Sequence, residues 1–235
     1  MEKLVYLVWR DPAVPVEVFS AALRERSAPR LVEAGARGVQ VNVADGAVAG
    51  ALIRMTELDP QPEAIVGVWV DSARDAARAP LDAALGAEAA RLAAYVVTES
   101  EPLPNTAHPA APGERTPGFA NVALLRRPAD MTPAAWLDAW QGQHTDVAIE
   151  IQSTFGYVQN AVVRAVTPDA PAIDAVVEEL FPIEALTSMH AFFAADDDDE
   201  LGRRLVLMGE STGRFGADRD LDVVPTSRYV MQPRP

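Results

Sequence analysis

The stretch from 119 to 164 reads FANVALLRRPADMTPAAWLDAWQGQHTDVAIEIQSTFGYVQNAVVR and shows the layout of the fold most clearly. An apolar run at 122–126 predicts a strand. Thr132, followed at once by a proline, is a strong helix-start signal, and the apolar spacing predicts a helix over 134–152. The glycine that opens 156–166 precedes alternating residues typical of a second strand. This stretch therefore predicts a strand, a helix and a strand in succession.

The rest of the second half continues in the same style. Apolar and β-branched residues predict a third strand, helical spacing predicts two further helical stretches, and a final run predicts a closing strand. These elements are expected at 175–181 (strand), 184–194 and 201–208 (helices) and 222–231 (strand).

The first half carries the same order of elements. Four apolar runs predict strands at 3–9, 38–43, 64–70 and 92–99. A helix is expected over 16–34, where Pro29 should bend or break it, and alanine-rich helices follow 71–72. Strand, helix, strand, strand, helix, strand is the split βαβ, or ferredoxin-like, pattern.

The helix positions of the two halves match at one constant offset, and after a one-residue gap Gly38 and Asn42 match Gly156 and Asn160. An internal repeat that extends over a strand, a turn and a helix is hard to obtain by chance. We therefore expect a degenerate repeat at 1–100, a proline-rich linker at 101–117 and a second repeat at 118–235. The matched helix positions are Phe19 with Trp136, Leu23 with Trp140, and Ser27 with His144.

The repeat has a consequence for architecture. A split βαβ unit covers only one face of its sheet with helices, yet strands such as AIVGVWV at 64–70 are apolar on both faces. The bare faces must therefore be buried together. We predict an α+β protein in which two antiparallel sheets pack face to face around a shared core, as an intrachain pseudo-dimer. A further homodimer stays open.

The second half resembles a known family. The segment LLRRPADMTPAAWLDAWQGQHTDVA is similar to the opening of the EthD family, within the dimeric α/β-barrel superfamily. The family has a basic residue at the end of the strand and a Met-Ser/Thr pair at the start of the helix. Two aromatic residues follow one turn apart, and a histidine lies near the end of the helix. The family's usual proline after that histidine is absent. The resemblance implies the barrel fold and a role in small-molecule breakdown or aromatic polyketide chemistry. The positions concerned are Arg127, Met131, Thr132, Trp136, Trp140 and His144.

The same helix suggests a site. At helical spacing, Trp136, Trp140 and His144 lie toward the sheet, and Tyr157 begins the next strand. We expect them to line a pocket, with His190 reaching in and Arg127 steering an anionic ligand. His144 is the candidate catalytic acid or base, because imidazole exchanges protons near neutral pH. The alternative for the aromatic residues and the histidines is ordinary packing or capping, and for Arg127 it is contact with solvent or an acidic neighbour.

Composition narrows the field. The chain has no cysteine, so disulfides and thiolate chemistry are excluded, and a cytoplasmic location is expected. A net charge of −14 disfavours nucleic-acid partners. No stretch approaches the roughly 20 apolar residues of a membrane span. The scattered histidines have no metal-ligand spacing, so neither a metal nor an organic cofactor is expected.

Two functions fit these observations. The first is an EthD-like enzyme that acts on an aromatic or polyketide-like small molecule by cofactor-independent acid/base chemistry, of the lyase, dehydratase or isomerase type. The second is a non-catalytic protein that binds a small molecule or assists assembly on the same scaffold. Its support is the sparse polar inventory and the replacement of the histidine by Ser27 in the first half.

Overall fold

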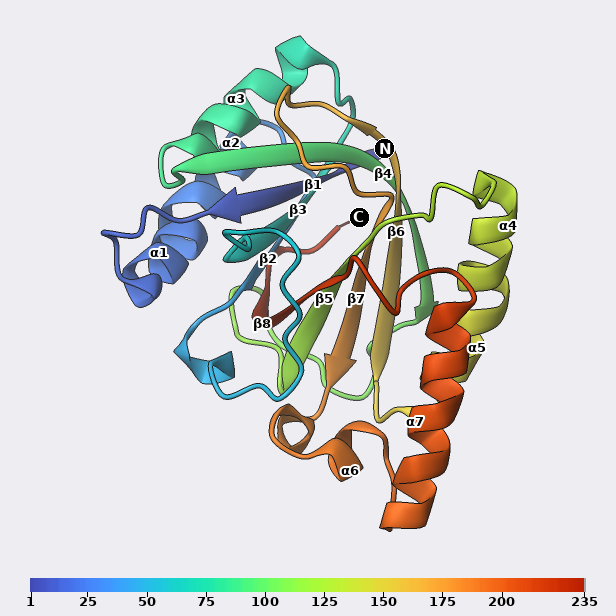
Figure 1. The fold of residues 1–235 in the computed structure, drawn as a ribbon. Helices are drawn as coiled ribbons and strands as arrows, with labels where there is room; N and C mark the ends of the chain where they lie inside the picture. The colour runs from blue at the N-terminus through green and yellow to red at the C-terminus, as the bar shows by residue number, and fades with distance from the viewer. Residues whose placement is uncertain (235) are drawn as a thin grey trace.

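The computed structural model describes residues 1–234 and contains a closed barrel of eight antiparallel strands (Figure 1). Around the barrel the strands follow the order β1-β3-β2-β8-β5-β7-β6-β4. The α+β class is thus confirmed, and closure of the sheet is consistent with a dimeric α/β-barrel. The strands are β1 (Glu2–Trp9), β2 (Gly38–Val43), β3 (Ala64–Val70), β4 (Arg91–Leu103), β5 (Phe119–Leu125), β6 (Gly156–Ala165), β7 (Ala175–Phe181) and β8 (Asp222–Gln232).

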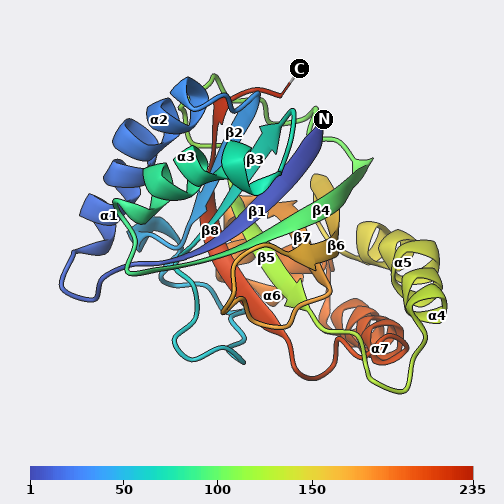
Figure 2. The same cartoon turned by 90° about the horizontal axis from the view of Figure 1, so that it is seen from above.

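Two groups of helices cover the barrel from different sides (Figure 2). Elements of the first half form one group and elements of the second half form the other. None of the helices within residues 1–234 is both long enough and apolar enough to cross a bilayer. The helices are α1 (Val16–Ala22), η1 (Leu23–Ser27), α2 (Ala28–Glu33), η2 (Gly46–Val48) and α3 (Asp75–Gly86) in the first half, and α4 (Pro133–Leu137), η3 (Asp138–His144), α5 (Thr145–Ile151), η4 (Ile183–Leu186), α6 (Met189–Phe192) and α7 (Asp198–Gly213) in the second.

The strands are apolar on both faces because both faces are buried. Successive side chains of a strand point to opposite sides. In β1, one set packs in the core beneath the helices and the alternate set packs in the barrel interior. The helix-side set is Leu4, Tyr6 and Val8, and the interior set is Val5, Leu7 and Trp9.

Each half supplies four neighbouring strands of the barrel. The first half contributes the order β4-β1-β3-β2, and the second half contributes β8-β5-β7-β6. The halves join where β2 pairs with β8 and β4 pairs with β6, both antiparallel. The structure adds one detail to the predicted face-to-face packing of two sheets around a shared core. The sheets share edge hydrogen bonds as one closed surface, which leaves no exposed edge.

The helices differ from the sequence-based expectation in three ways. Pro29 does not break the first helix, because α1 continues through the π-helical segment η1 into α2 with the proline near its start. The helix expected over 184–194 is interrupted, since Ser188 begins the separate helix α6 and caps it. The closing helix α7 is longer than expected and is capped by Asp197.

The connection between β2 and β3 extends over the second half of the chain before it returns to the first. We call residues 44–63 the strap. Its Leu52 amide donates to the carbonyl of Leu186 (2.9 Å), and Met55 forms an isolated bridge with Val223 of β8. A sequence of low periodicity can adopt this path because the second half supplies its hydrogen-bond partners.

The predicted linker is shorter than expected at its start. β4 continues to Leu103, which pairs with Tyr157 of β6. The segment that follows, as far as Gly118, contains no strand or helix of its own. The division of the chain into two repeats and a linker stays a prediction.

Candidate functional site

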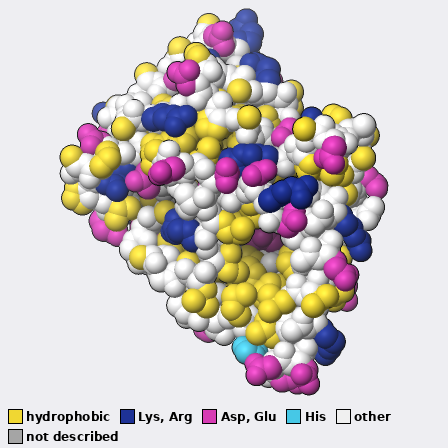
Figure 3. Space-filling model, in the orientation of Figure 1, with side chains coloured by type: hydrophobic (Ala, Val, Ile, Leu, Met, Phe, Trp, Pro, Cys, Tyr) yellow, Lys and Arg dark blue, Asp and Glu magenta, His cyan; other side chains and the backbone are white. Residues whose placement is uncertain are grey.

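A pocket of about 320 Å³ lies in the second half, between the helices and the sheet. It opens between the strap and α7 as a hollow with hydrophobic walls (Figure 3). This volume lies within the range usual for small-molecule sites. The lining is mainly apolar and aromatic: Ile53, Met55, Ala123, Leu125, Trp140, Val177, Phe192, Phe193, Met208, Phe215, Ala217, Leu221 and Val223, with polar positions at Asn121, His144, Gln152, Tyr157, Glu179, Thr212 and Asp218.

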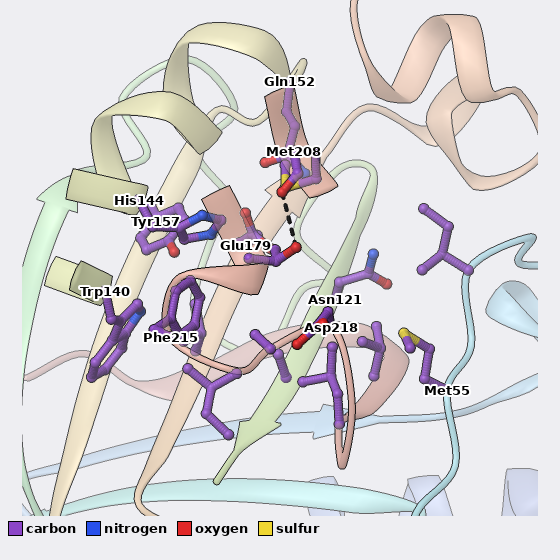
Figure 4. Close-up of a pocket in the computed structure, with 18 of the residues that line it drawn as sticks. Met55, Asn121, Trp140, His144, Gln152, Tyr157, Glu179, Met208, Phe215 and Asp218 are labelled. Atoms are coloured by element: carbon purple, nitrogen blue, oxygen red, sulfur yellow. Dashed lines mark hydrogen bonds between the residues drawn. The ribbon is translucent and has the colours of Figure 1, made fainter. Parts of the chain in front are cut away.

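Three polar side chains form a row across the floor of the pocket. Register places Asn121 of β5 opposite Glu179 of β7, and Glu179 opposite Tyr157 of β6. Directly opposed residues on adjacent antiparallel strands point to the same face, with Cβ atoms about 5 Å apart. The three side chains therefore form one continuous polar strip, with Glu179 in its middle (Figure 4).

The same row in the first half is aliphatic. There Leu4 of β1 pairs with Val68 of β3, and Val68 pairs with Val39 of β2. All three are buried in the helix-side core. Conversion of an aliphatic row into Asn, Glu and Tyr costs desolvation, which argues for a role other than packing.

One position on the floor distinguishes this pocket from the matching place in the first half. Tyr6 of β1 fills the first half and donates to Asp82 of α3 (2.9 Å). At the constant offset its counterpart in β5 is Ala123, which lines the pocket. A tyrosine replaced by an alanine leaves a void that core packing does not refill.

His144 ends the π-helical segment η3 and faces the pocket. Its Nδ1 lies 2.9 Å from the hydroxyl oxygen of Ser211 on α7, and its ring lies 4.8 Å from that of Phe215. The side chain is 7% exposed. Burial lowers its pKa from 6.5 to about 4, so the imidazole is neutral at neutral pH.

Trp140 and Tyr157 form the wall beside His144. Trp140 is fully buried, and its side chain hydrogen-bonds to Tyr157. Burial, and after it the charge of Glu179, raise the pKa of Tyr157 well above its ordinary value, so its hydroxyl stays protonated. The Tyr157 hydroxyl can therefore donate a hydrogen bond into the pocket.

Glu179 is the polar group with the most unusual setting. Its side chain is half-buried and lines the pocket. Burial raises its pKa from 4.5 to about 7. The amide nitrogen of Gln152 donates to its Oε1 at 3.0 Å and to the carbonyl of Ala148 at 3.1 Å. A carboxyl group that titrates near neutral pH can both accept and return a proton.

The structure brings together half of the residues expected at the site. Trp140, His144 and Tyr157 line the pocket. Trp136 packs behind Trp140, with ring centres 5.0 Å apart, and its indole N–H donates to the carbonyl of Phe215 (3.1 Å).

The other two candidates lie elsewhere. The guanidinium of Arg127 donates to the carbonyl of Met131 in its own loop. His190 is a surface residue of α6, and its Nε2 contacts Asp198 at 2.9 Å. The geometry gives no support to the expected ligand contacts of Arg127, His190 or Trp136.

Sequence reasoning missed Asn121 and Glu179. A signal was present in the sequence. When AVVEELF at 175–181 is aligned with AIVGVWV at 64–70, a charged residue falls at the position of Val68. Alternation alone could not show whether Glu178 or Glu179 faces the helices, since both faces of the strand are buried.

Charge in the pocket is one-sided. Among the lining residues are two carboxyl groups, Glu179 and Asp218, and no lysine or arginine. Within residues 1–234, no cluster of three or more His, Asp or Glu side chains is arranged to hold a metal ion. The lining therefore offers hydrogen-bond donors and acceptors and titratable carboxyl groups.

Comparisons with known proteins support the family resemblance. The family model of the EthD domain matches residues 128–210, which confirms the predicted resemblance over this stretch. No curated protein matches the chain. A solved structure described as an anthrone oxidase-like protein is similar, with a TM-score of 0.59 and 11% identity over 100% of this chain and 94% of that chain. A structure from Lactobacillus acidophilus NCFM, named provisionally as a monooxygenase, has a TM-score of 0.46 and 9% identity over 98% of this chain and 96% of that chain.

Proposed function

We propose, from the EthD domain at residues 128–210, that this protein is an enzyme acting on a flat aromatic or polyketide-like small molecule. The chemistry is cofactor-independent acid/base catalysis of the lyase, dehydratase or isomerase type. One observation carries the proposal: an apolar pocket holds a strip of polar side chains on its floor and a neutral histidine beside it. Pockets of this kind hold a ligand by apolar contact and orient it by a few polar groups.

The lining suits a planar aromatic ligand. Trp140, Tyr157 and Phe215 present ring surfaces, and Met55 and Met208 supply adaptable apolar contacts. The name of the similar structure, an anthrone oxidase-like protein, points to a tricyclic aromatic ketone as a first probe. Anthrone has a carbonyl group, two aromatic rings and an acidic methylene carbon.

His144 has a defined part in this proposal. Its pKa is lowered to about 4, so the ring is neutral at neutral pH. Nδ1 is hydrogen-bonded to Ser211, which leaves Nε2 for a ligand oxygen. A neutral imidazole that donates to an oxygen stabilises negative charge as it develops there. His144→Ala should therefore reduce turnover more than it reduces binding.

We further propose that the chain arose by tandem duplication and that only the second half is active. The π-helical segments η1 and η3 end at the matched positions Ser27 and His144. Ser27 is fully buried and bonds to the carbonyl of Ala84 (3.1 Å), in a half whose floor is filled by Tyr6. The first half would then serve as the structural partner that closes the barrel.

A pocket-filling variant tests the site. Ala123→Phe restores a large side chain where the first half has one, and we expect it to abolish binding of anthrone. Anthrone binding is measured by quenching of tryptophan fluorescence and by thermal shift. Val163→Phe, on an exposed position of β6, is the matched control and should bind as the wild type does.

The outcomes separate the candidate functions. Unchanged anthrone binding by a folded Ala123→Phe protein would overturn the assignment of this pocket. Binding to the wild type that never leads to a chemical change, across anthrone and hydroxylated anthrones, would favour the non-catalytic binding protein.

A further inference from the structure

We infer that Glu179 is the catalytic base of this pocket and that the substrate is an uncharged, hydroxylated aromatic ketone that loses a proton from carbon. This inference rests on the proposed function and names its base and substrate class.

The two adjacent glutamates of β7 have opposite settings. Glu178 points into the barrel, where Arg228 lies 2.6 Å from its Oε1 and the Gln40 amide donates to its Oε2 at 2.6 Å. Glu179 points to the helices and has no ion-pair partner within the described chain, only the neutral amide of Gln152. A carboxyl group without an ion-pair partner beside apolar walls is free to exchange a proton.

The surroundings of Glu179 decide its titration. The titratable groups that line the same pocket are Tyr157 from β6, His144 from η3, and Asp218 from the loop before β8. Tyr157 stays protonated and His144 stays neutral at neutral pH, and no cation balances a carboxylate here. The pKa of Glu179 near 7 suits proton transfer at neutral pH, while His144 at about 4 is too weak a base.

Polar atoms in the pocket that lack a hydrogen-bond partner indicate which groups the substrate carries. Asn121 is 3% exposed, and its Oδ1 has no hydrogen-bond donor in residues 1–234. His144 uses only Nδ1 in its contact with Ser211, so within the described chain its Nε2 is free for a ligand. Buried polar atoms are nearly always paired. A ligand with a hydroxyl group for Asn121 and a carbonyl oxygen for Nε2 of His144 would complete both.

The lack of a cation on the pocket wall sets the charge of the substrate. An anionic ligand beside the ionised form of Glu179 would meet like charge, and no lysine or arginine among the described residues lines the pocket to compensate it. An uncharged aromatic molecule buries its rings against the apolar walls and meets no such penalty. Charge develops only during the reaction, when the proton leaves.

The step is a proton transfer that needs no oxidant. A C–H bond of the methylene group conjugated with the ketone breaks, and its proton moves to an oxygen of the Glu179 carboxylate. The electron pair of that bond forms a C=C bond to the ring, a ring π pair shifts to the carbonyl carbon, and the carbonyl π pair moves to oxygen, which gives an enolate conjugated through the ring. Return of a proton from Glu179 to carbon or to oxygen completes an exchange or a tautomerisation.

The test uses anthrone in D₂O without oxygen, with deuterium uptake at the methylene carbon followed by mass spectrometry. We expect the full-length wild type to accelerate exchange and Glu179→Gln to lose roughly 10²–10⁴-fold of that acceleration. Anthrone binding by Glu179→Gln should persist. Glu150→Gln, a charge removal on the exposed side of α5, is the matched control and should exchange as the wild type does.

A pH profile adds a second readout. Exchange by the wild type should rise with pH to a plateau, with a midpoint of about 7, as Glu179 ionises. Glu179→Asp keeps a carboxyl group one methylene shorter, so it should retain part of the rate and a pH-dependent profile. This variant keeps the inference testable if the glutamine variant does not fold.

Failure of the inference differs from failure of the proposed function. If the Glu179→Gln protein accelerates deuterium exchange into anthrone as much as the wild type does, the assignment of the base is overturned. The assignment of the pocket as the binding site is then unaffected. Anthrone bound by the wild type without accelerated exchange would overturn proton abstraction from carbon. A wild type that does not bind anthrone or its hydroxylated derivatives would overturn the substrate class.

Discussion

His144 and Glu179 show how one physical cause acts oppositely on a base and an acid. Burial disfavours the charged form of each group, so it lowers the pKa of the imidazole to about 4 and raises that of the carboxyl group to about 7. Between these values both side chains are mainly neutral. The pocket therefore holds little charge of its own around these two groups in mildly acidic solution.

This pair should shape the dependence of stability on pH. The folded-state pKa of Glu179 exceeds its ordinary 4.5, so its stabilising contribution is present below about 4.5 and is lost as the pH rises through about 7. The unfolding free energy of the wild type should fall between about pH 5 and pH 8 as Glu179 ionises. In Glu179→Gln this fall should be smaller by roughly 1–3 kcal/mol. Urea unfolding at both pH values measures the difference. An identical loss in both proteins would show that Glu179 titrates normally.

His144 limits stability from the acid side. Its folded-state pKa of about 4 lies below the ordinary 6.5, so the fold keeps the full contribution above about 6.5 and loses it as the pH falls through about 4. The two groups together place the most favourable pH between these limits. Other titrating groups act over the same range, so the variant comparison isolates the term that belongs to Glu179.

At the residue scale, sequence reasoning found the helix side of the pocket and missed its floor. Trp140, His144 and Tyr157 were predictable because helical spacing fixes which residues face the sheet. Asn121 and Glu179 were not, because a strand buried on both faces gives no pattern that separates the pocket side from the barrel side. Only the register between strands brings these two into one row with Tyr157.

At the scale of elements, the π-helical segments are the main feature that periodicity could not predict. Helical spacing assumes 3.6 residues per turn throughout, yet η1 and η3 each widen the helix at matched places. Such segments are rare and are often found at functional sites. In the second half the widened turn ends at His144, so it sets the direction in which the imidazole enters the pocket.

A buried carboxylate anchors the second part of the strap. Asp222 is fully buried, and its Oδ1 accepts hydrogen bonds from the amides of Glu57 and Leu58, each at 3.0 Å. Its Oδ2 accepts from Arg126 at 2.9 Å. The strap has almost no secondary structure of its own, so these bonds hold it over the pocket.

Asp222→Asn should therefore loosen the strap. The amide group presents a donor to Arg126 and removes the charge that strengthens these bonds, so we expect a loss of about 1–3 kcal/mol in unfolding free energy. Hydrogen exchange at Glu57 and Leu58 should accelerate more than exchange in the barrel strands. Asp130→Asn, on an exposed turn, is the control. Uniform acceleration across the chain would show global destabilisation without a specific effect on the strap.

At the scale of the whole molecule, the doubly apolar strands predicted a shared core, and the structure contains one. The interior cluster draws Val5 and Leu7 from the first half together with Val122 and Leu124 from the second. Hydrophobic patterning identifies which faces must be buried. It carries no information on how sheet edges meet, so closure through β2·β8 and β4·β6 could not be predicted.

Closure makes the halves depend on each other, which a split chain tests. A cut between Leu103, where β4 ends, and Phe119, where β5 begins, separates the halves without breaking a strand. Each fragment would expose the barrel-facing side of its sheet and two unpaired edge strands, both of which favour aggregation. Neither fragment should therefore fold as a monomer, whereas co-expressed fragments should assemble one-to-one with the circular dichroism spectrum and anthrone binding of the intact chain. A fragment that is monomeric, well folded and cooperative in unfolding would contradict this dependence, because it would show that one half can bury its barrel-facing side chains without the other.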